Sequence, residues 1–154
     1  MDRFTITPTA SCIVRQDSKL LVLRRKNSSY MNGYFCLPGG HVEAAETLQQ
    51  AISRELQEET GIVVLPETWE LFCIVQTVID SRAYMRFIFR TSNWSGNLEL
   101  GEPHKAEDLG FYEMSELDKL TPSDTLIVQH MNRAGLTYLS LIEKNGKLVQ
   151  STVI

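Results

Sequence analysis

The sequence predicts a mixed α/β protein, because strand-like and helix-like segments alternate along its 154 residues. Three observations carry this prediction: two helices with cap signals, apolar strands in pairs joined by short polar turns, and the absence of any repeat, low-complexity segment or linker. At roughly 150 residues per domain, the length fits a single domain over residues 1–154.

The N-terminal third of the chain predicts three short strands. Ser11–Arg15 and Leu20–Arg24 are apolar runs on either side of a polar Gln-Asp-Ser-Lys turn, which is typical of a hairpin. The stretch Lys26–Gly33 is polar and rich in turn residues, so we expect a surface loop there. Tyr34–Leu37 follows as a short strand, and the sequence Pro38-Gly39-Gly40 ends it.

The clearest helix spans Thr47–Thr60. Thr47 and Gln50 have the spacing of a capping box, and Gly61 stands just past the C-terminal end. Apolar residues recur at helical spacing and predict the face that the helix buries. They are Leu48, Ala51, Ile52 and Leu56.

Two strands follow this helix, Leu71–Ile79 and Tyr84–Arg90, around a turn at Asp80-Ser81. In the second strand Met85, Phe87 and Phe89 alternate with polar residues, so we expect one buried face and one wetter face. A further short strand is expected at Leu109–Tyr112.

The last part of the chain predicts a helix and a hairpin. Thr121 is an N-cap followed by Pro122 at the first helical position, and the helix is expected to stop at Gly135 with Ile127, Met131 and Ala134 facing inward. Asn145-Gly146 is a hairpin-turn signal. The segment 136–154 is therefore compatible with an edge hairpin or with a contact in a homodimer.

Composition excludes several classes of protein. The apolar fraction of 43% and charged fraction of 22% are ordinary for globular proteins, which argues against disordered, collagen-like and coiled-coil chains. With 15 basic and 19 acidic residues the net charge is −4, which offers no electrostatic footprint for duplex nucleic acid or an anionic membrane. No targeting segment or membrane-length apolar run is visible, and three cysteines form no metal-binding spacing, so we expect a cytoplasmic protein.

The chemistry signal is a group of glutamates at the end of the first helix. Glu55, Glu58 and Glu59 lie within one turn just before Gly61, where both mutual repulsion and the negative end of the helix dipole disfavour them. Arg54 is the one basic residue on this helix and cannot neutralise all three. A divalent cation would resolve the conflict, and carboxylate oxygens favour Mg²⁺ or Mn²⁺. The alternative is a solvated acidic face at a helix end.

These residues resemble the signature of the Nudix hydrolase family. Gly40 is followed by Glu46 and then by Arg-Glu-Leu-Gln-Glu-Glu-Thr-Gly-Ile at residues 54–62, which matches the complete Nudix box. Together with the order of the elements, the resemblance covers about residues 8–135. It implies an α/β/α sandwich with a mixed sheet, in which the box forms a loop–helix–loop metal site.

The resemblance also implies roles for individual residues. Glu55, Glu58 and Glu59, with the carbonyl of Gly39, would hold Mg²⁺ or Mn²⁺. Either Glu55 or Glu58 would act as the catalytic base, while Arg54 orients the glutamates. Glu46 would brace the loop. The implied reaction is the hydrolysis of a nucleoside diphosphate linked to a further group X.

A diphosphate substrate needs positive charge near the acidic helix. Arg24 and Arg25 follow the second strand, and by the same resemblance they are candidates for the phosphates; the alternative is a basic strand end facing water. Tyr30, Tyr34 and Phe35 are candidates for stacking on a base, although aromatic residues near a strand more often pack in the interior.

The branch of the family is indicated by Glu102-Pro103-His104-Lys105, which resembles the MutT-like nucleotide pyrophosphohydrolases. An additional metal-binding residue of that branch would map to Glu102, His104 or Glu107, with an exposed loop histidine as the simpler reading of His104. We therefore expect a (d)NTP pyrophosphohydrolase that releases a nucleoside monophosphate and pyrophosphate. The alternatives are an ADP-ribose or nucleotide-sugar pyrophosphatase and a non-catalytic, nucleotide-sensing module.

Overall fold

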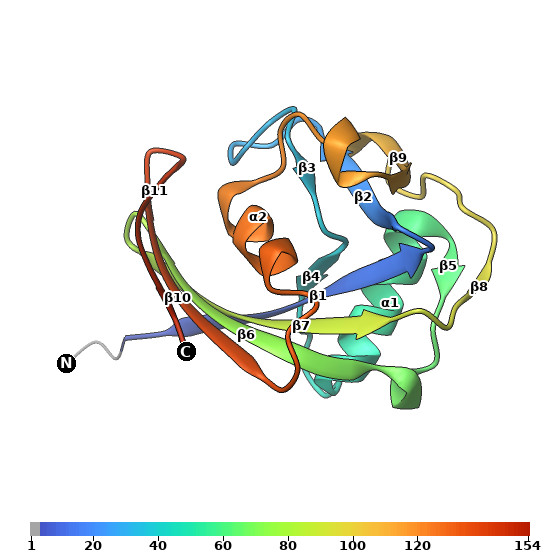
Figure 1. The fold of residues 1–154 in the computed structure, drawn as a ribbon, viewed down its shortest axis with the longest axis horizontal. Coiled ribbons are helices and arrows are strands. Elements are labelled where there is room, and N and C mark those ends of the chain that lie inside the picture. The colour runs from blue at the N-terminus through green and yellow to red at the C-terminus, as the bar shows by residue number, and fades with distance from the viewer. Residues whose placement is uncertain (1–3) are drawn as a thin grey trace.

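The computed structural model describes residues 4–154, so the first three residues of the expected domain 1–154 lie outside the described part. Strands outnumber helices, as the alternation of short apolar runs and turns predicts (Figure 1). The strands are β1 (Ile6–Gln16), β2 (Lys19–Arg25), β3 (Phe35–Cys36), β4 (Gly39–His41), β5 (Ile62–Val63), β6 (Glu70–Ile79), β7 (Arg82–Thr91), β8 (Ser95–Gly96), β9 (Ala106–Tyr112), β10 (Thr137–Lys144) and β11 (Lys147–Val153). The helices are α1 (Leu48–Thr60) and α2 (Pro122–Gln129), with short 3-10 turns at Pro66–Thr68 and Met114–Glu116.

Most strands of the described residues join one mixed sheet. Its order is β11-β10-β6-β7-β1-β2-β3, with β4 beside β1 and β9 beside β2. The pairs β1–β7 and β10–β6 are parallel, while the other neighbours run antiparallel. The expected N-terminal hairpin is confirmed, but β1 starts earlier than predicted and only its end pairs with β2, through Arg15–Leu20 and Gln16–Lys19.

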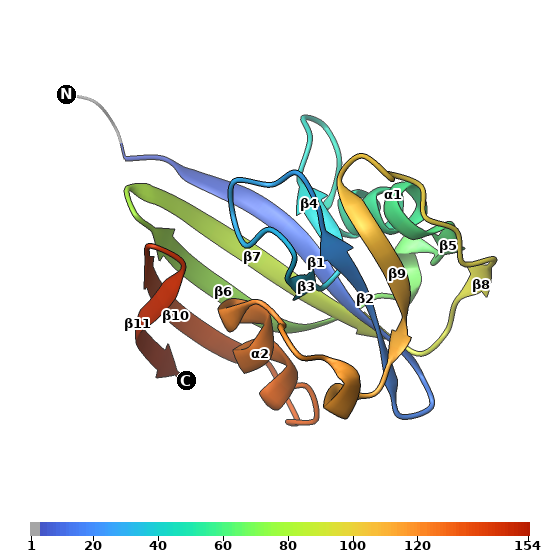
Figure 2. The same ribbon diagram turned by 90° about the horizontal axis from the view of Figure 1, so that it is seen from above.

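Strand β1 lies between two hydrophobic cores. Its side chains alternate in direction, so Ala10, Cys12 and Val14 enter the core under α1, while Ile13 enters the core under α2. Helices α1 and α2 consequently lie on opposite sides of β1 (Figure 2). This arrangement confirms the predicted α/β/α sandwich and explains why an unbroken run of the strand is buried.

Helix α1 has the boundaries that its caps predict. The Thr47 hydroxyl accepts from the Gln50 amide at 3.2 Å, and the Gln50 side chain accepts from the Thr47 amide at 2.8 Å. Gly61 ends the helix with φ of 72°, a left-handed conformation that glycine adopts without strain. Of the predicted inward residues, Ala51, Ile52 and Leu56 are buried and Leu48 is partly covered.

The expectation of one wet face on β7 is wrong. Ile88, on the face opposite Phe87 and Phe89, is fully buried, and the Arg86 side chain is only 18% exposed. The physical reason is that each face of β7 packs against a hydrophobic core, Phe87 and Phe89 in the core with α1 and Ile88 in the core with α2.

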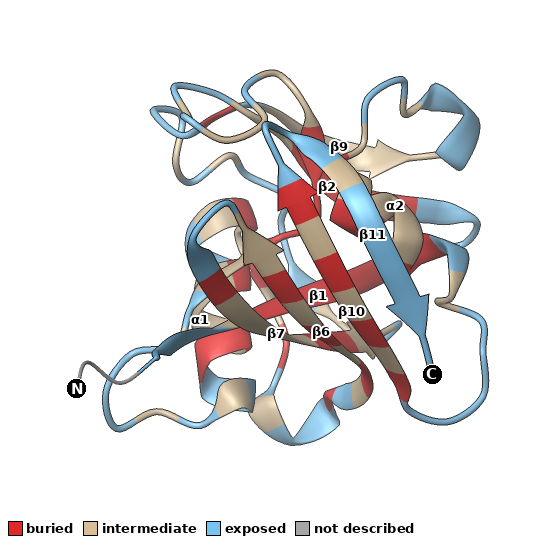
Figure 3. Cartoon of the chain, turned by 90° about the vertical axis from the view of Figure 1, so that its left-hand side faces the viewer, coloured by how far each residue is buried: buried red, intermediate tan, exposed pale blue. Residues whose placement is uncertain are grey.

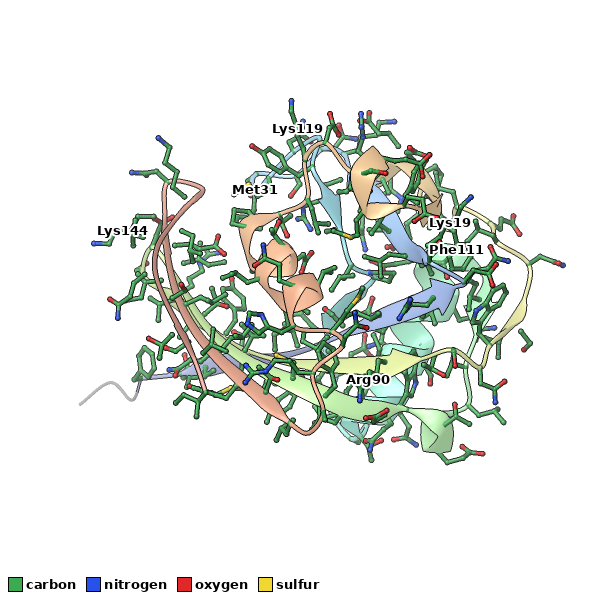
Figure 4. All side chains as sticks on the ribbon, viewed as in Figure 1. Lys19, Met31, Arg90, Phe111, Lys119 and Lys144 are labelled. Atoms are coloured by element: carbon green, nitrogen blue, oxygen red, sulfur yellow. The ribbon has the colours of Figure 1, made fainter. Side chains whose placement is uncertain are left out.

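Helix α2 starts as predicted but ends six residues before Gly135, at Gln129. Ile127 is buried and Met131 is partly covered, whereas Ala134 is exposed and does not face inward. The chain leaves the helical path where Arg90 of β7 donates to the Met131 carbonyl at 3.0 Å (Figure 4). A contact from a distant strand therefore replaces the last helical turns.

The C-terminal segment forms the expected edge hairpin. Asn145 and Gly146 have φ of 50° and 71°, as a tight two-residue turn between β10 and β11 requires. Along β10 every second residue is buried, whereas β11 is largely exposed at the edge of the sheet (Figure 3).

Cys12, Cys36 and Cys73 are buried free thiols, in keeping with their apolar surroundings. Between residues 4 and 154, neither helix combines the length and the apolar character needed to cross a membrane.

Candidate active site

A pocket of about 940 Å³ opens beside the C-terminal half of α1. Its floor comes from β1, β6 and β7, and its sides come from the loop after β2, the turn before β4, the loop before β9 and the start of α2. Residues from these separate segments include Ser11, Arg25, Tyr30, Gly39, Gly40, Glu55, Glu59, Thr77, Arg86, Glu102, Lys105 and Asp124.

The two glycines of the Pro38-Gly39-Gly40 turn are required by close approach. A Cβ on Gly39 would lie 2.2 Å from the backbone oxygen of Ala10, and the φ of Gly39 is +145°. A Cβ on Gly40 would lie 2.4 Å from the Glu55 carboxylate. The turn therefore sits directly against strand β1 on one side and against the helix glutamates on the other.

Glu59 is anchored to this turn. Its carboxylate accepts the Gly39 amide at 2.9 Å. Burial raises the pKa of Glu59 to about 8; the Gly39 hydrogen bond opposes the rise, and the charges of Glu55 and Glu102 add to it. A carboxyl group with such a pKa is one whose ionised form a nearby cation would stabilise strongly.

Arg54 organises the other glutamates. Its guanidinium donates to both oxygens of Glu46, at 2.8 and 3.2 Å, and also to Glu55 at 3.0 Å and Glu58 at 3.2 Å. These hydrogen bonds lower the pKa of Glu46, and they raise that of Arg54. Arg54 also donates to the His41 carbonyl, so one side chain ties the helix to the loop that precedes it.

The three helix glutamates are not equally placed. Glu55 and Glu59 line the pocket, whereas Glu58 does not, and its side chain is 54% exposed on the side where Arg54 holds it. Among residues 4–154, no three Asp, Glu, His or Cys side chains lie close enough together to form a ready group of metal ligands. The donor chemistry still fits a hard divalent cation, since Glu55, Glu59 and the Gly39 turn offer only oxygen.

The loop before β9 closes over the end of α1. The amides of Glu99 and Gly101 donate to the last carbonyls of the helix, those of Thr60 and Glu59, at 2.9 and 3.1 Å. This loop brings Glu102 and Lys105 into the pocket as an ion pair of 2.7 Å. Of the three residues considered for an additional ligand, Glu102 lines the pocket, while His104 and Glu107 are exposed and do not.

Of the two candidate arginines for the phosphates, one lies in the pocket and the other does not. Arg25 lines the pocket, next to Lys26. The structure does not bring Arg24 there: its guanidinium lies 4.5 Å from the centre of the Phe35 ring and 3.5 Å from Asp118. Successive residues of a strand face opposite sides of the sheet, so only one of the pair can point into the pocket.

The aromatic candidates separate as well. Tyr30 lines the pocket, whereas Tyr34 does not. Phe35 is buried and packs against Tyr112 and under Arg24. Packing explains Phe35, and Tyr30 alone of the three is available to a ligand of this pocket.

Sequence reasoning missed the far side of the pocket. Arg86 forms a buried ion pair with Asp124 and donates to the Ser11 hydroxyl at 2.7 Å. Asp124 also accepts the Leu37 amide at 2.9 Å, which fixes the residue before the Pro38 turn. Two sequence signals pointed to these residues, an arginine inside an apolar strand and an acid in the first turn of α2. The acid has a simpler interpretation, because the helix dipole favours a negative charge at that end of a helix.

Comparisons with known proteins agree with this geometry. A family model described as "NUDIX domain" matches residues 5–131. An ADP-ribose pyrophosphatase of Methanocaldococcus jannaschii is 32% identical over 123 residues, 79% of this chain and 70% of that protein. An 8-oxo-dGTP diphosphatase of Proteus vulgaris is 39% identical over 98 residues, 64% of this chain and 86% of that protein. The crystal structure of a MutT protein from Bacillus halodurans superposes with a TM-score of 0.81 at 25% identity, covering 96% and 97% of the two chains.

Proposed function

This chain belongs to the Nudix family and is a hydrolase, and we propose that it hydrolyses nucleoside triphosphates to a nucleoside monophosphate and pyrophosphate. One observation carries the proposal: a single pocket combines the carboxylates of Glu55 and Glu59 with the cations of Arg25, Lys26 and Lys105. Carboxylates of this kind suit a divalent ion, and the cations suit the phosphate chain that the ion would help to bind.

The acidic side of the pocket is where we place the metal. Members of the family generally use divalent metals. Glu55 and Glu59, with the carbonyl of Gly39, would hold Mg²⁺ or Mn²⁺, and Glu58 would join them only after leaving Arg54. A bound divalent ion supplies a Lewis acid that neutralises charge building up on the diphosphate.

The chain's own residues would carry the proton transfer. Water attacks a phosphorus of the anhydride, the bond to the leaving phosphate oxygen breaks, and a carboxylate accepts the proton of the water. Of the two expected bases, Glu55 lines the pocket and Glu58 does not, which favours Glu55. Arg54 and Glu46 would act as positioning residues, because the hydrogen bond from Arg54 fixes the Glu55 carboxylate and Glu46 fixes Arg54.

ADP-ribose is the second candidate substrate. The M. jannaschii relative that covers 79% of this chain carries the name ADP-ribose pyrophosphatase. The near full-length likeness to a MutT protein and the Proteus vulgaris diphosphatase favour the triphosphate instead. Both substrates contain the same diphosphate, so the same acidic and basic residues would serve either one.

The test is a hydrolysis screen with Mg²⁺ or Mn²⁺. It compares the common and oxidised nucleoside triphosphates with ADP-ribose and a nucleotide sugar, and it measures pyrophosphate separately from phosphomonoesters. Pyrophosphate from a triphosphate is the expected result, and cleavage of ADP-ribose alone would select the second candidate.

Variants of α1 locate the activity. Glu55→Gln and Glu59→Gln should each lower turnover by about 100-fold or more, the usual contribution of a general base or a charged site residue. Gln57→Ala changes an exposed residue of the same helix and serves as the matched control. Unchanged turnover in both glutamine variants would contradict the proposed site.

A further inference from the structure

Glu143 is a buried carboxylate that the proposed reaction does not use. It lies on β10, in the C-terminal hairpin, beyond the residues 5–131 that the family model matches. Every second residue of this strand faces the core, and Glu143 follows Leu139 and Leu141 in that series. Glu143 itself is fully buried, so a charged residue stands where the pattern calls for an apolar one.

The surroundings of Glu143 make the burial of its carboxylate energetically unfavourable. One carboxylate oxygen accepts the Tyr30 hydroxyl at 2.6 Å, while the other has no hydrogen-bond partner among residues 4–154. Burial raises the pKa of Glu143; the Tyr30 hydrogen bond and the charge of Arg86 oppose the rise, and the charge of Asp124 adds to it. A half-satisfied buried carboxylate destabilises a core more than leucine would, which indicates a use other than stability.

The partner of Glu143 belongs to the wall of the pocket. Tyr30 is on the loop after β2, and Arg25 fixes that loop by donating to the Tyr30 carbonyl at 2.9 Å. The next residue, Met31, lies against the hairpin turn, where a Cβ on Gly146 would be 3.2 Å from its terminal methyl. The loop after β2 therefore reaches the tip of the β10–β11 hairpin (Figure 2). Figure 4 labels Met31 on this loop and Lys144 at the end of β10.

The sheet register places this contact far from the acidic turn. Gly39 pairs with Ser11, which lies beside Ile88 of β7. Glu143 lies beside Ile79, which pairs with Arg82 at the other end of β7. Ile88 and Arg82 are six positions apart on β7, roughly 20 Å of backbone at about 3.3 Å per residue. This separation leaves room for a phosphate chain at the glutamates and a base near Tyr30.

We infer that the C-terminal hairpin is part of the substrate site: Tyr30 contacts the nucleobase, and Glu143 is a positioning residue that holds the Tyr30 ring in the pocket wall. The inference rests on the proposed function, since it assigns the base end of the same substrate. Stacking on an aromatic ring suits any base, so Tyr30 contributes affinity for nucleotides over base-free phosphates.

The test is binding of reaction products, which needs no turnover. Calorimetry compares a nucleoside monophosphate, the tightest of AMP, GMP, CMP and UMP for the wild type, with ribose 5-phosphate, which lacks the base. Glu143→Ala and Tyr30→Phe both remove the hydrogen bond, so each should weaken nucleotide binding about tenfold, or ~1.4 kcal/mol, and leave ribose 5-phosphate unchanged. The double variant should be no weaker than either single one, because one contact is lost in all three.

Further variants separate positioning from folding. Glu143→Gln keeps an acceptor for the Tyr30 hydroxyl and should restore most of the affinity, even if Glu143→Ala is unstable. Tyr30→Leu removes the ring and should lose more affinity than Tyr30→Phe. Lys144→Gln, at the exposed neighbouring position, is the matched control.

The outcomes for this inference and for the proposed function differ. If the wild type hydrolyses nucleotides but Tyr30→Leu and Glu143→Ala bind the monophosphate normally, the inference is overturned and the proposed function stands. Equal loss of ribose 5-phosphate affinity, or no monophosphate binding by the wild type, also overturns it. If no nucleotide is hydrolysed while base-dependent binding follows Tyr30 and Glu143, the inference is supported and the hydrolytic proposal fails.

Discussion

The ion pair between Arg86 and Asp124 gives the sharpest prediction about stability. Asp124 is 1% exposed, and its two oxygens accept from Arg86 and from the Leu37 amide. Asp124→Asn preserves the shape of the side chain and one acceptor, but it removes the negative charge that neutralises the Arg86 guanidinium. The variant therefore leaves a buried positive charge without a counter-charge.

The size of the effect follows from this geometry. Removing one partner of a buried ion pair costs about 3–5 kcal/mol, and the acceptor that remains for Leu37 favours the lower end. At roughly 2–4 °C per kcal/mol for a chain of this length, the Tm should fall by roughly 6–12 °C. The Leu37 amide adjoins the Pro38 turn, so activity should fall as well, even at temperatures where the variant is folded.

Thermal unfolding followed by calorimetry measures the loss. Asp118→Asn is the control, because it changes an exposed carboxylate, 63% accessible, that pairs with Arg24 at 3.5 Å and should alter stability by less than about 1 kcal/mol. Replacing both partners, as Arg86→Met with Asp124→Leu, should destabilise less than Asp124→Leu alone, since neither charge of the pair is left buried without its partner. A Tm for Asp124→Asn within 2 °C of the wild type would refute this reasoning.

Three further predictions concern the acidic and basic sides of the pocket. Without metal, Glu59→Gln should become increasingly more stable than the wild type as pH rises from 5 to 8. Burial raises the pKa of Glu59 from 4.5 to about 8, so ionisation of Glu59 over that interval opposes folding of the wild type. Parallel curves of unfolding free energy against pH for the two proteins would contradict this. Gly39→Ala should lower the Tm far more than Gly40→Ala, because a Cβ on Gly39 meets backbone whereas a Cβ on Gly40 meets the movable Glu55 carboxylate. Displacing that carboxylate should abolish the activity of Gly40→Ala while the protein stays folded. Equal losses of Tm in the two variants would argue against the close approach of Gly39 to β1. Arg25→Met should raise the KM for the nucleotide about tenfold, which is the effect of losing one charge-assisted contact. Arg24→Met should mainly lower the Tm, because Arg24 packs over Phe35. A KM that rises only with Arg24→Met would reverse the assignment.

Local signals explain which elements the sequence could predict. Both ends of α1 were predictable because the Thr47 cap and Gly61 act within a few residues of the helix itself. The end of α2 was not, because the contact that interrupts it comes from Arg90, 41 residues before the carbonyl it binds. Tertiary contacts of this kind override local helix signals.

The candidate site also has a part that the sequence could predict and a part that it could not. Its acidic half lies within 39–59, so the resemblance to one continuous motif brought Gly39 and the helix glutamates into one hypothesis. Arg86, Asp124 and Glu143 come from three elements that are distant in sequence, and each has an ordinary local reading as a strand or helix residue. Which of Arg24 and Arg25 enters the pocket likewise depends on the face of β2, which the sequence does not specify at a strand end.

The long-range pairing of β1 with β7 also bears on the order of folding. Turns such as those between β6 and β7 and between β10 and β11 close short loops and form early, whereas pairing Ile6 with Ala83 must first overcome the entropy of closing a long loop. The contacts that assemble the pocket are of the second kind: Ser11 and Arg86 are 75 residues apart, and Tyr30 and Glu143 are 113 apart. During synthesis, the residues of the acidic turn and of helix α1 therefore emerge well before Asp124 of the far wall, and Glu143, the hydrogen-bond partner of Tyr30, emerges later still.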